Sequence, residues 1–134
     1  MIVVDSNVIA YCWINGPLTA VAQRVRVKDP DWHAPVLWRS EMQSILTGYL
    51  RDGGLSRANV VHIMTAIERA LAGCEHIVPS EHIFEIAARS PLSSYDCEFV
   101  ALADALDVPL ITADKAVLKA FPARARTMQA FLAD

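Results

Sequence analysis

Three consecutive β-branched residues, Ile2-Val3-Val4, stand near the start of the chain and lead directly into Asp5. A short, uninterrupted apolar run of this kind is typical of a strand that is buried on both faces, as in a parallel sheet. The residues from Ser6 to Ile14 then fit a helix, which the turn-forming sequence Asn15-Gly16-Pro17 ends. A buried strand followed at once by a helix predicts an α/β fold.

The same alternation continues along the rest of the chain. Further short strands are expected at residues 32–34, 76–79, 108–112 and 126–128. Helices are expected at residues 18–28, 36–51, 56–72, 93–106 and 114–121, and one more begins with Ser80 as its cap. Strands that alternate with helices imply right-handed crossovers and a parallel sheet covered by helices. No linker, repeat or low-complexity segment divides the chain, so we expect a single domain over residues 1–134.

The composition supports a compact domain and excludes several other classes of protein. Hydrophobic residues make up 54% of the 134 residues and charged residues 20%, which excludes a disordered chain. No apolar run approaches the roughly 18 residues that a membrane helix needs, and no signal peptide is visible. Cys12, Cys74 and Cys97 show no CxxC spacing, so we expect reduced thiols and a cytoplasmic protein.

Four carboxylates fall where a parallel sheet gathers its ligands, at the carboxyl ends of the strands. Asp5 follows the first expected strand, and Asp114 follows the strand at 108–112. Asp96 lies in the first turn of the helix that leads into that strand. Because this helix runs antiparallel to the strands, its first turn lies at the edge of the sheet where the strands end. Glu41, on the helix at 36–51, can reach this edge as well. Carboxylates that converge repel one another, and a hard divalent cation such as Mg²⁺ or Mn²⁺ relieves the repulsion.

Each of these acids also has an ordinary structural explanation. Asp5 and Asp114 each precede a helix, where aspartate is a favoured N-cap. Asp96 follows Ser93 by three residues, as in a capping box with a short acid. Glu41 fits a solvated helix surface. The convergence of all four on one edge favours a cation site over four separate structural roles.

The formal net charge of −3, from 12 basic and 15 acidic residues, argues at first against a protein that binds nucleic acid. The positions of the acids alter this conclusion about nucleic acid. If four of the 15 acids hold cations, 11 acids remain against 12 basic residues. The net charge then no longer excludes a nucleic acid as the substrate.

Four segments of the chain carry a more specific signal: IVVDSNV at 2–8, SEM at 40–42, SYDCEFVALA at 94–103 and LITADKAVL at 110–118. Together they resemble the PIN domain family, and within it the VapC-type toxins of type II toxin–antitoxin systems. The similarity runs in order over nearly the whole chain without a large insertion. It implies a single PIN domain over residues 1–134, built as a three-layer sandwich with helices on both sides of a central parallel sheet.

The resemblance implies a metal-dependent endoribonuclease that hydrolyses RNA phosphodiester bonds. The family's catalytic acids, which bind one or two Mg²⁺ or Mn²⁺ ions, match four positions in this chain: Asp5, Glu41, Asp96 and Asp114. Its supporting polar residues, which orient the carboxylates, match Ser6, Asn7 and Thr112. Helix capping or a bridge between strands is the alternative role for Ser6 and Thr112.

Basic residues near these positions are candidates for contacts with RNA phosphates: Arg24, Lys28, Arg39 and Lys115. A solvated basic face is the alternative for Arg24. The resemblance further implies a homodimer and a cognate antitoxin whose C-terminal segment lies across the site. The four histidines, at positions 33, 62, 76 and 82, lie dispersed outside the motif segments, and we expect them at the surface or at its boundary.

Three other functions are alternatives to this interpretation. A catalytically inactive PIN-like binding module would not need the four intact acids. A phosphoacceptor receiver domain needs a paired acid after its first strand and a lysine at the end of a late strand, and Lys115 lies in the wrong context for that role. A PIN-domain nuclease that processes RNA without an antitoxin stays open from the sequence.

Overall fold

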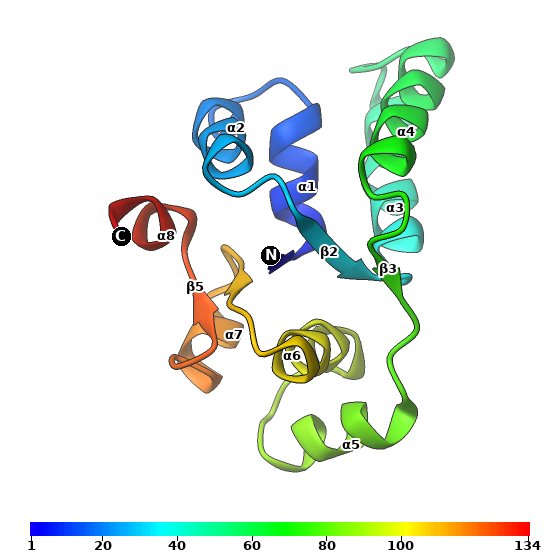
Figure 1. Ribbon diagram of the computed structural model, residues 1–134. Helices are drawn as coiled ribbons and strands as arrows, with labels where there is room; N and C mark the ends of the chain where they lie inside the picture. The colour runs from blue at the N-terminus through cyan, green and yellow to red at the C-terminus, as the bar shows by residue number, and fades with distance from the viewer.

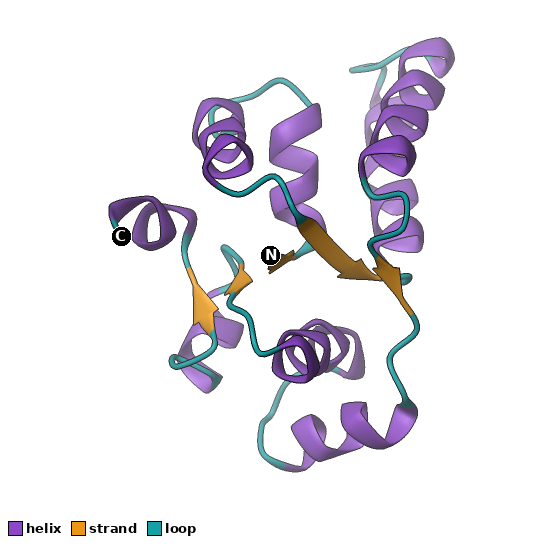
Figure 2. Ribbon diagram, viewed as in Figure 1, coloured by secondary structure: helices purple, strands orange, loops and turns teal.

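A computed structural model describes all residues, 1–134, as a parallel sheet between layers of helices (Figure 1). The strands are β1 (Ile2–Val4), β2 (Trp32–Pro35), β3 (Glu75–His76), β4 (Leu110–Ile111) and β5 (Ala125–Arg126). The first four helices are α1 (Ser6–Trp13), α2 (Thr19–Lys28), α3 (Trp38–Asp52) and α4 (Arg57–Ala70). The others are α5 (Ser80–Ala88), α6 (Ser94–Leu106), α7 (Lys115–Ala120) and α8 (Met128–Ala133). Strands and helices alternate through most of the chain (Figure 2), as predicted.

The sheet places the first strand at its centre. The strand order is β3-β2-β1-β4-β5, and every neighbouring pair is parallel. Val3 is paired with His33 of β2 on one side and with Leu110 of β4 on the other. The backbone pairing of β1 with β4 continues past β1, because the amide of Asp5 donates to the carbonyl of Ile111 at 3.1 Å. This bond fixes Asp5 at the carboxyl edge of the sheet, beside the end of β4.

The hydrophobic core lies on both faces of this sheet. The β1 residues are at most 1% exposed, as expected of a strand covered on both sides. Helices α1 to α4 lie on one side of the sheet, and α5 and α6 lie on the other (Figure 1). Helix α6 packs against β1, β2 and β4, and its buried residues are Cys97 and those from Phe99 to Ala103. The α/β three-layer sandwich expected from the sequence is therefore confirmed.

Several local predictions were wrong in detail. The last six helical residues form α8, with Thr127 as N-cap, where only a strand near 126–128 was expected. Ser80 is the first residue of α5 and not its cap, a position that Pro79 occupies without a side-chain hydrogen bond. Strands β3 and β4 have two residues each, shorter than the expected 76–79 and 108–112.

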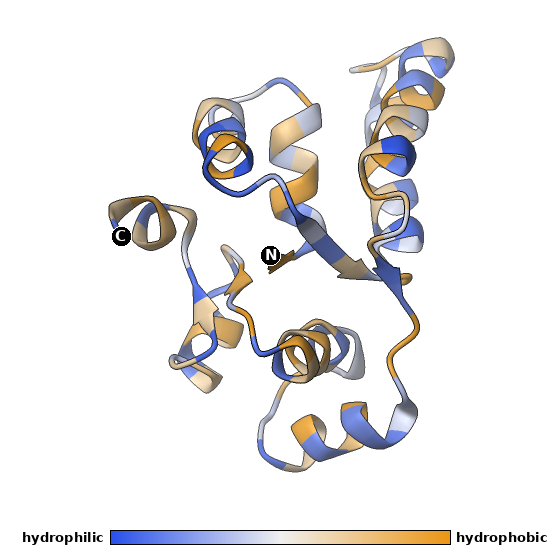
Figure 3. Ribbon diagram, in the orientation of Figure 1, coloured by the Kyte–Doolittle hydropathy of each residue, from blue (hydrophilic) through white to orange (hydrophobic).

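The surface of the helices is mixed in polarity, as Figure 3 shows for α4 and α5, where hydrophilic and hydrophobic residues alternate along the ribbon. None of the helices has the length and apolar character that a membrane crossing requires. All three cysteines are free thiols; Cys12 and Cys97 are buried, and Cys74 is half-buried.

Candidate active site

A cavity of about 260 Å³ opens at the carboxyl edge of the sheet, where β1 and β4 end. All four acids predicted from the sequence line it, together with the three polar residues that were expected to support them. The lining consists of Asp5, Ser6, Asn7, Glu41, Ser44, Ile45, Asp96, Phe99, Leu110, Thr112, Asp114 and Val117. The predicted convergence of carboxylates from four separate parts of the chain is thus present in the structure.

Asp5 connects the first strand to the cavity. Its backbone is extended, and its Oδ1 accepts a hydrogen bond of 3.0 Å from the amide of Val8, so Asp5 is the N-cap of α1. Its other oxygen, Oδ2, accepts a hydrogen bond from the hydroxyl of Thr112. The capping role and the position in the cavity therefore occur together in one side chain.

Thr112 joins two of the acids. Its side chain is buried, and while its hydroxyl donates to Asp5, its Oγ1 accepts the amide of Asp114 at 3.0 Å. Asp114 in turn caps α7, because its Oδ1 accepts from the amides of Ala116 at 2.8 Å and Val117 at 3.2 Å. One hydroxyl thus fixes the relative positions of the carboxylates that follow β1 and β4.

Glu41 and Asp96 enter the cavity from two helices. Glu41 lies in the first turn of α3, and its Oε1 accepts a 2.8 Å hydrogen bond from the hydroxyl of Ser6, which is 5% exposed. Asp96 lies in the first turn of α6, where its amide donates to Oγ of the N-cap Ser93 at 3.2 Å. The amide of Asp96 is thus held by the cap, and its side chain lines the cavity.

Negative charge in the cavity is unfavourable, as the pKa values of its carboxyl groups show. The pKa of Asp5, Glu41 and Asp96 is raised in each case, mainly because burial removes water from the charged carboxylate. Repulsion adds to the rise: Asp114 acts on both Asp5 and Asp96, and Asp96 and Asp5 act on Glu41. No lysine or arginine lines the cavity to balance this charge. A set of oxygen donors without a basic partner fits a hard divalent cation.

The four predicted basic residues lie outside the cavity lining, and two of them are engaged elsewhere. Arg39 makes ion pairs with Glu75 and Glu68, both at 2.6 Å. Lys28 donates to the carbonyls of Phe131 at 2.5 Å and Asp134 at 2.8 Å, and so holds the C-terminal helix against α2. Arg24 on α2 and Lys115, which follows Asp114, are exposed to solvent.

Some features of the site were missed in the sequence. Ser44 and Phe99 line the cavity three residues after Glu41 and Asp96, so they lie one helical turn further along α3 and α6. That spacing was the signal that could have found them. The expectation that the four histidines lie apart from one another was wrong for His33 and His76. His33 is buried, and its Nδ1 lies 2.8 Å from Nε2 of His76.

Comparison with known sequences and structures agrees with this geometry. The sequence model of the PIN domain family matches residues 2–122. No curated protein matches the chain significantly in sequence.

Three solved structures share the fold at low sequence identity. PAE2754 from Pyrobaculum aerophilum aligns with a TM-score of 0.75 and 16% identity, over 98% of this chain and 93% of that chain. FitAcB from Neisseria gonorrhoeae aligns with a TM-score of 0.76 and 15% identity, over 96% and 99%. FitAB bound to the IR36 DNA fragment aligns with a TM-score of 0.75 and 16% identity, over 96% and 95%. The common architecture covers nearly the full length of each protein.

Proposed function

The chain belongs to the PIN domain family, and from that membership and the acid-lined cavity we propose that it is an Mg²⁺- or Mn²⁺-dependent endoribonuclease. The observation that carries the proposal is the meeting of four carboxylates in one cavity that no basic residue lines. Such a cavity binds cations in preference to a free anionic ligand. PIN domains are in general nucleases, and the family resemblance of the acidic motifs points to RNA as the substrate.

The proposed roles of the acids follow from their positions. Asp5, Asp96 and Asp114 hold one or two metal ions from the strand ends and the start of α6. Glu41 completes the ligand set or positions the attacking water. A divalent ion in such a site supplies a water of lowered pKa and neutralises charge on the phosphate and the leaving oxygen.

The polar residues keep the carboxylates in place. Ser6 orients Glu41, and Thr112 orients Asp5 through the hydrogen bonds described above. Asn7 lines the cavity one residue beyond Ser6 and is exposed, which allows it to contact the bound water or the substrate. Partners of this kind fix ligand geometry before the metal arrives, so less ordering is needed on binding.

Substrate RNA would be held by exposed basic residues, of which Lys115 adjoins the acidic cavity and Arg24 lies on α2 outside its lining. Lys115 directly follows Asp114 and has no ion-pair partner, so we propose it as a phosphate contact, with Arg24 as a second candidate. Arg39 and Lys28 are weaker candidates. The guanidinium of Arg39 is already paired with a carboxylate, and the ammonium group of Lys28 already donates to backbone carbonyls.

We propose further that the chain is the toxin of a toxin–antitoxin pair. The resemblance to VapC-type toxins supports this, and so does the similarity to FitAB, a protein that has been solved bound to DNA. The partners in this proposal are an antitoxin that covers the cavity and a second copy of the chain. The three free thiols fit the reducing cytoplasm as the compartment.

The activity can be tested with the purified chain, free of any partner, on structured RNA. Cleavage is expected with Mn²⁺ or Mg²⁺ and is expected to stop with EDTA. Asp96→Asn should lower the rate by at least about a hundredfold. Glu81→Gln is the matched control, because Glu81 is an exposed acid on α5 outside the cavity. Equal cleavage by the Asp96→Asn and Glu81→Gln variants would contradict the site, and cleavage of DNA alone would contradict the substrate.

Expression in cells separates a toxin from an RNA-processing nuclease. A toxin arrests growth when it is expressed alone, and co-expression of its antitoxin restores growth. The Asp96→Asn variant should not arrest growth. If the active chain is harmless in its native host, the processing nuclease without an antitoxin becomes the better description.

A further inference from the structure

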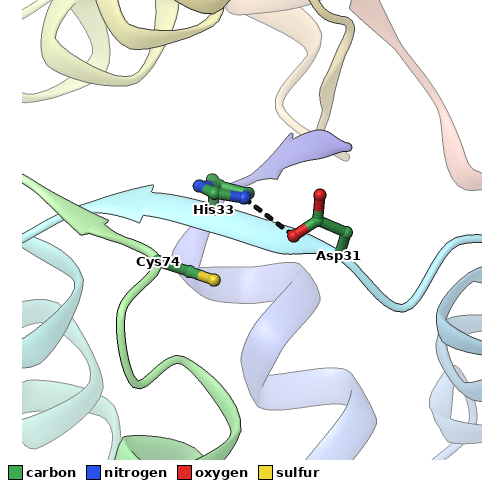
Figure 4. A group of neighbouring side chains, drawn as sticks. All are labelled: Asp31, His33 and Cys74. Carbon is green, nitrogen blue, oxygen red and sulfur yellow. Dashed lines mark hydrogen bonds and ion pairs between the residues drawn. The ribbon is translucent and has the colours of Figure 1, made fainter.

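A second group of metal-ligating side chains lies at the start of β2 and β3. Asp31 precedes β2, His33 lies within it, and Cys74 precedes β3 (Figure 4). The potential ligand atoms of these three residues all lie within 4.8 Å of one another. The two adjacent strands therefore bring together a carboxylate, an imidazole and a thiol from positions about 40 residues apart.

This group is separate from the acidic cavity. Asp31 stands at the amino end of β2, whereas Asp5 and Asp114 follow the carboxyl ends of β1 and β4. Because all the strands are parallel, these are opposite edges of the sheet. None of the three residues lines the acidic cavity.

The contacts of His33 prepare it to bind a metal. Its Nδ1 lies 2.8 Å from Nε2 of His76, and its Nε2 lies 2.8 Å from Oδ1 of Asp31. A neutral imidazole has one N–H and can donate to only one of these partners. When the proton is on Nδ1 and is donated to His76, the lone pair of Nε2 faces the carboxylate oxygen. A cation between those two atoms satisfies both.

That arrangement is the usual one for a metal-binding histidine, whose second ring nitrogen donates to a fixed partner. His76 suits the accepting role. Its Nε2 lies at hydrogen-bond distance from Nδ1 of His33, and burial, followed by the proximity of His33, lowers the pKa of His76, which favours its neutral form. His33 itself is 8% exposed and is held between its two partners.

The thiol and the carboxylate can adjust to an ion. Burial, and then the negative charge of Asp31, raises the pKa of Cys74 in the metal-free protein, and a bound cation would reverse the effect of that charge. The Asp31 side chain is 49% exposed, and its Oδ2 lies 3.8 Å from the amino group of Met1. Tetrahedral zinc ligands lie about 3.3–3.8 Å apart. The 2.8 Å between His33 Nε2 and Asp31 Oδ1 is shorter than that spacing, so the half-exposed Asp31 side chain would move away from His33 when an ion binds.

We propose that Asp31, His33 and Cys74 form a site for Zn²⁺ or a similar transition-metal ion. Nitrogen and sulfur donors select this class of ion, whereas the all-oxygen cavity selects Mg²⁺ or Mn²⁺. Three protein ligands leave the fourth position to water. The ion would link the start of β2 to the segment that enters the two-residue strand β3. This proposal does not depend on nuclease activity.

The test is metal binding to the purified chain without a histidine tag. Titration with Co²⁺ should produce the near-ultraviolet absorption of a thiolate–cobalt bond at one equivalent, and Zn²⁺ should displace it. Cys74→Ala should abolish that absorption, and Asp31→Asn should weaken Zn²⁺ binding by about 10–100-fold. Cys12→Ala is the control for thiols, because Cys12 belongs to neither site.

Two further measurements distinguish loss of the metal site from loss of the fold and from metal binding in the acidic cavity. Zn²⁺ should raise the melting temperature of Asp96→Asn, in which the acidic cavity is impaired, more than that of the double variant Asp96→Asn/Cys74→Ala. The two melting temperatures without metal show whether the double variant is folded. Asp96→Asn should bind Co²⁺ with the thiolate absorption unchanged. Absence of that absorption from the unmodified chain, or its persistence in a folded Cys74→Ala variant, would overturn the proposal.

Discussion

The hydroxyl of Ser6 donates a 2.8 Å hydrogen bond to Oε1 of Glu41, a residue 35 positions later in the chain. Ser6 is the first residue of α1 and directly follows Asp5, while Glu41 lies in the first turn of α3. The bond therefore joins two helices at the point where each of them borders the cavity. It also holds down the pKa of Glu41 against the larger effect of burial.

Ser6→Ala is expected to weaken divalent metal binding about 10–100-fold, as the loss of a partner of a metal ligand commonly does. The pKa of Glu41 should rise further, so the acid limb of the activity profile moves to higher pH. Calorimetric titration with Mn²⁺ and a pH–rate profile check both effects. Thr47→Ala is the matched control, because the hydroxyl of Thr47 donates only to the carbonyl of Gln43 within α3. If both variants bind Mn²⁺ equally, Ser6 does not position Glu41.

Thr112→Val is expected to destabilise the chain by about 1–3 kcal/mol, because it leaves the amide of Asp114 and an oxygen of Asp5 without their buried partner. For a domain of this size the melting temperature should fall by about 4–10 °C. Thr112→Ser keeps the hydroxyl and should recover most of the loss. Thermal unfolding followed by circular dichroism distinguishes the two variants, and equal melting temperatures would show that the hydroxyl is not the important group.

The raised pKa values predict how pH affects the stability of the metal-free chain. A carboxyl group whose pKa is higher in the folded than in the unfolded state binds more protons when folded, so stability falls as pH rises between the two values. Asp5, Glu41 and Asp96 all have this sign. Their contribution is favourable near the ordinary carboxyl pKa and is lost as pH rises through the raised values.

Glu41→Gln removes one of these charges and can still accept from Ser6. Without metal, this variant should melt about 2–4 °C above the unmodified chain at about pH 8, and the difference should shrink as the pH falls through the raised pKa of Glu41 towards the ordinary carboxyl pKa. Mg²⁺ or Mn²⁺ should raise the melting temperature of the unmodified chain more than that of the variant. A difference that grows at low pH would show that the sign is wrong.

Arg39 and Lys115 are expected to differ in how they affect RNA binding. Arg39 is bound by Glu75 and Glu68 with all side chains partly exposed, so Arg39→Gln should cost less than about 1 kcal/mol of stability. It should leave RNA affinity unchanged. Lys115→Gln should weaken binding and reduce the slope of log affinity against log salt by about one. Affinities measured at several salt concentrations, with the Asp96→Asn variant to prevent cleavage, test both expectations.

The acid site could be predicted because its residues follow from local rules. A buried parallel strand ends at Asp5, and Asp96 and Asp114 stand at helix starts, so chain geometry alone brings them to one edge of the sheet. The same residues do act as helix caps or lie in first turns, which shows that the structural and the functional interpretation are compatible. Local rules alone do not place Glu41 at this edge, because its position depends on how α3 packs beside α1.

Two of the features that were missed depend on contacts between distant segments. The pairing of His33 with His76 results from the neighbouring positions of β2 and β3, which no local pattern encodes. Arg39 looked free in sequence, but the same neighbouring strand brings Glu75 to its guanidinium. Helix α8 was missed because residues 126–128 were predicted to form a strand, although Thr127 caps the helix that follows.

The position of β1 at the centre of the sheet also sets the order in which the molecule can be completed during synthesis. Residues 2–4 are synthesised well before residues 110–111, which form their neighbour β4. Asp5 therefore has no Asp114 beside it until the intervening residues have been synthesised. A nascent chain that has not reached residue 114 lacks one of the four carboxylates, so the complete cavity cannot form before Asp114 has been added.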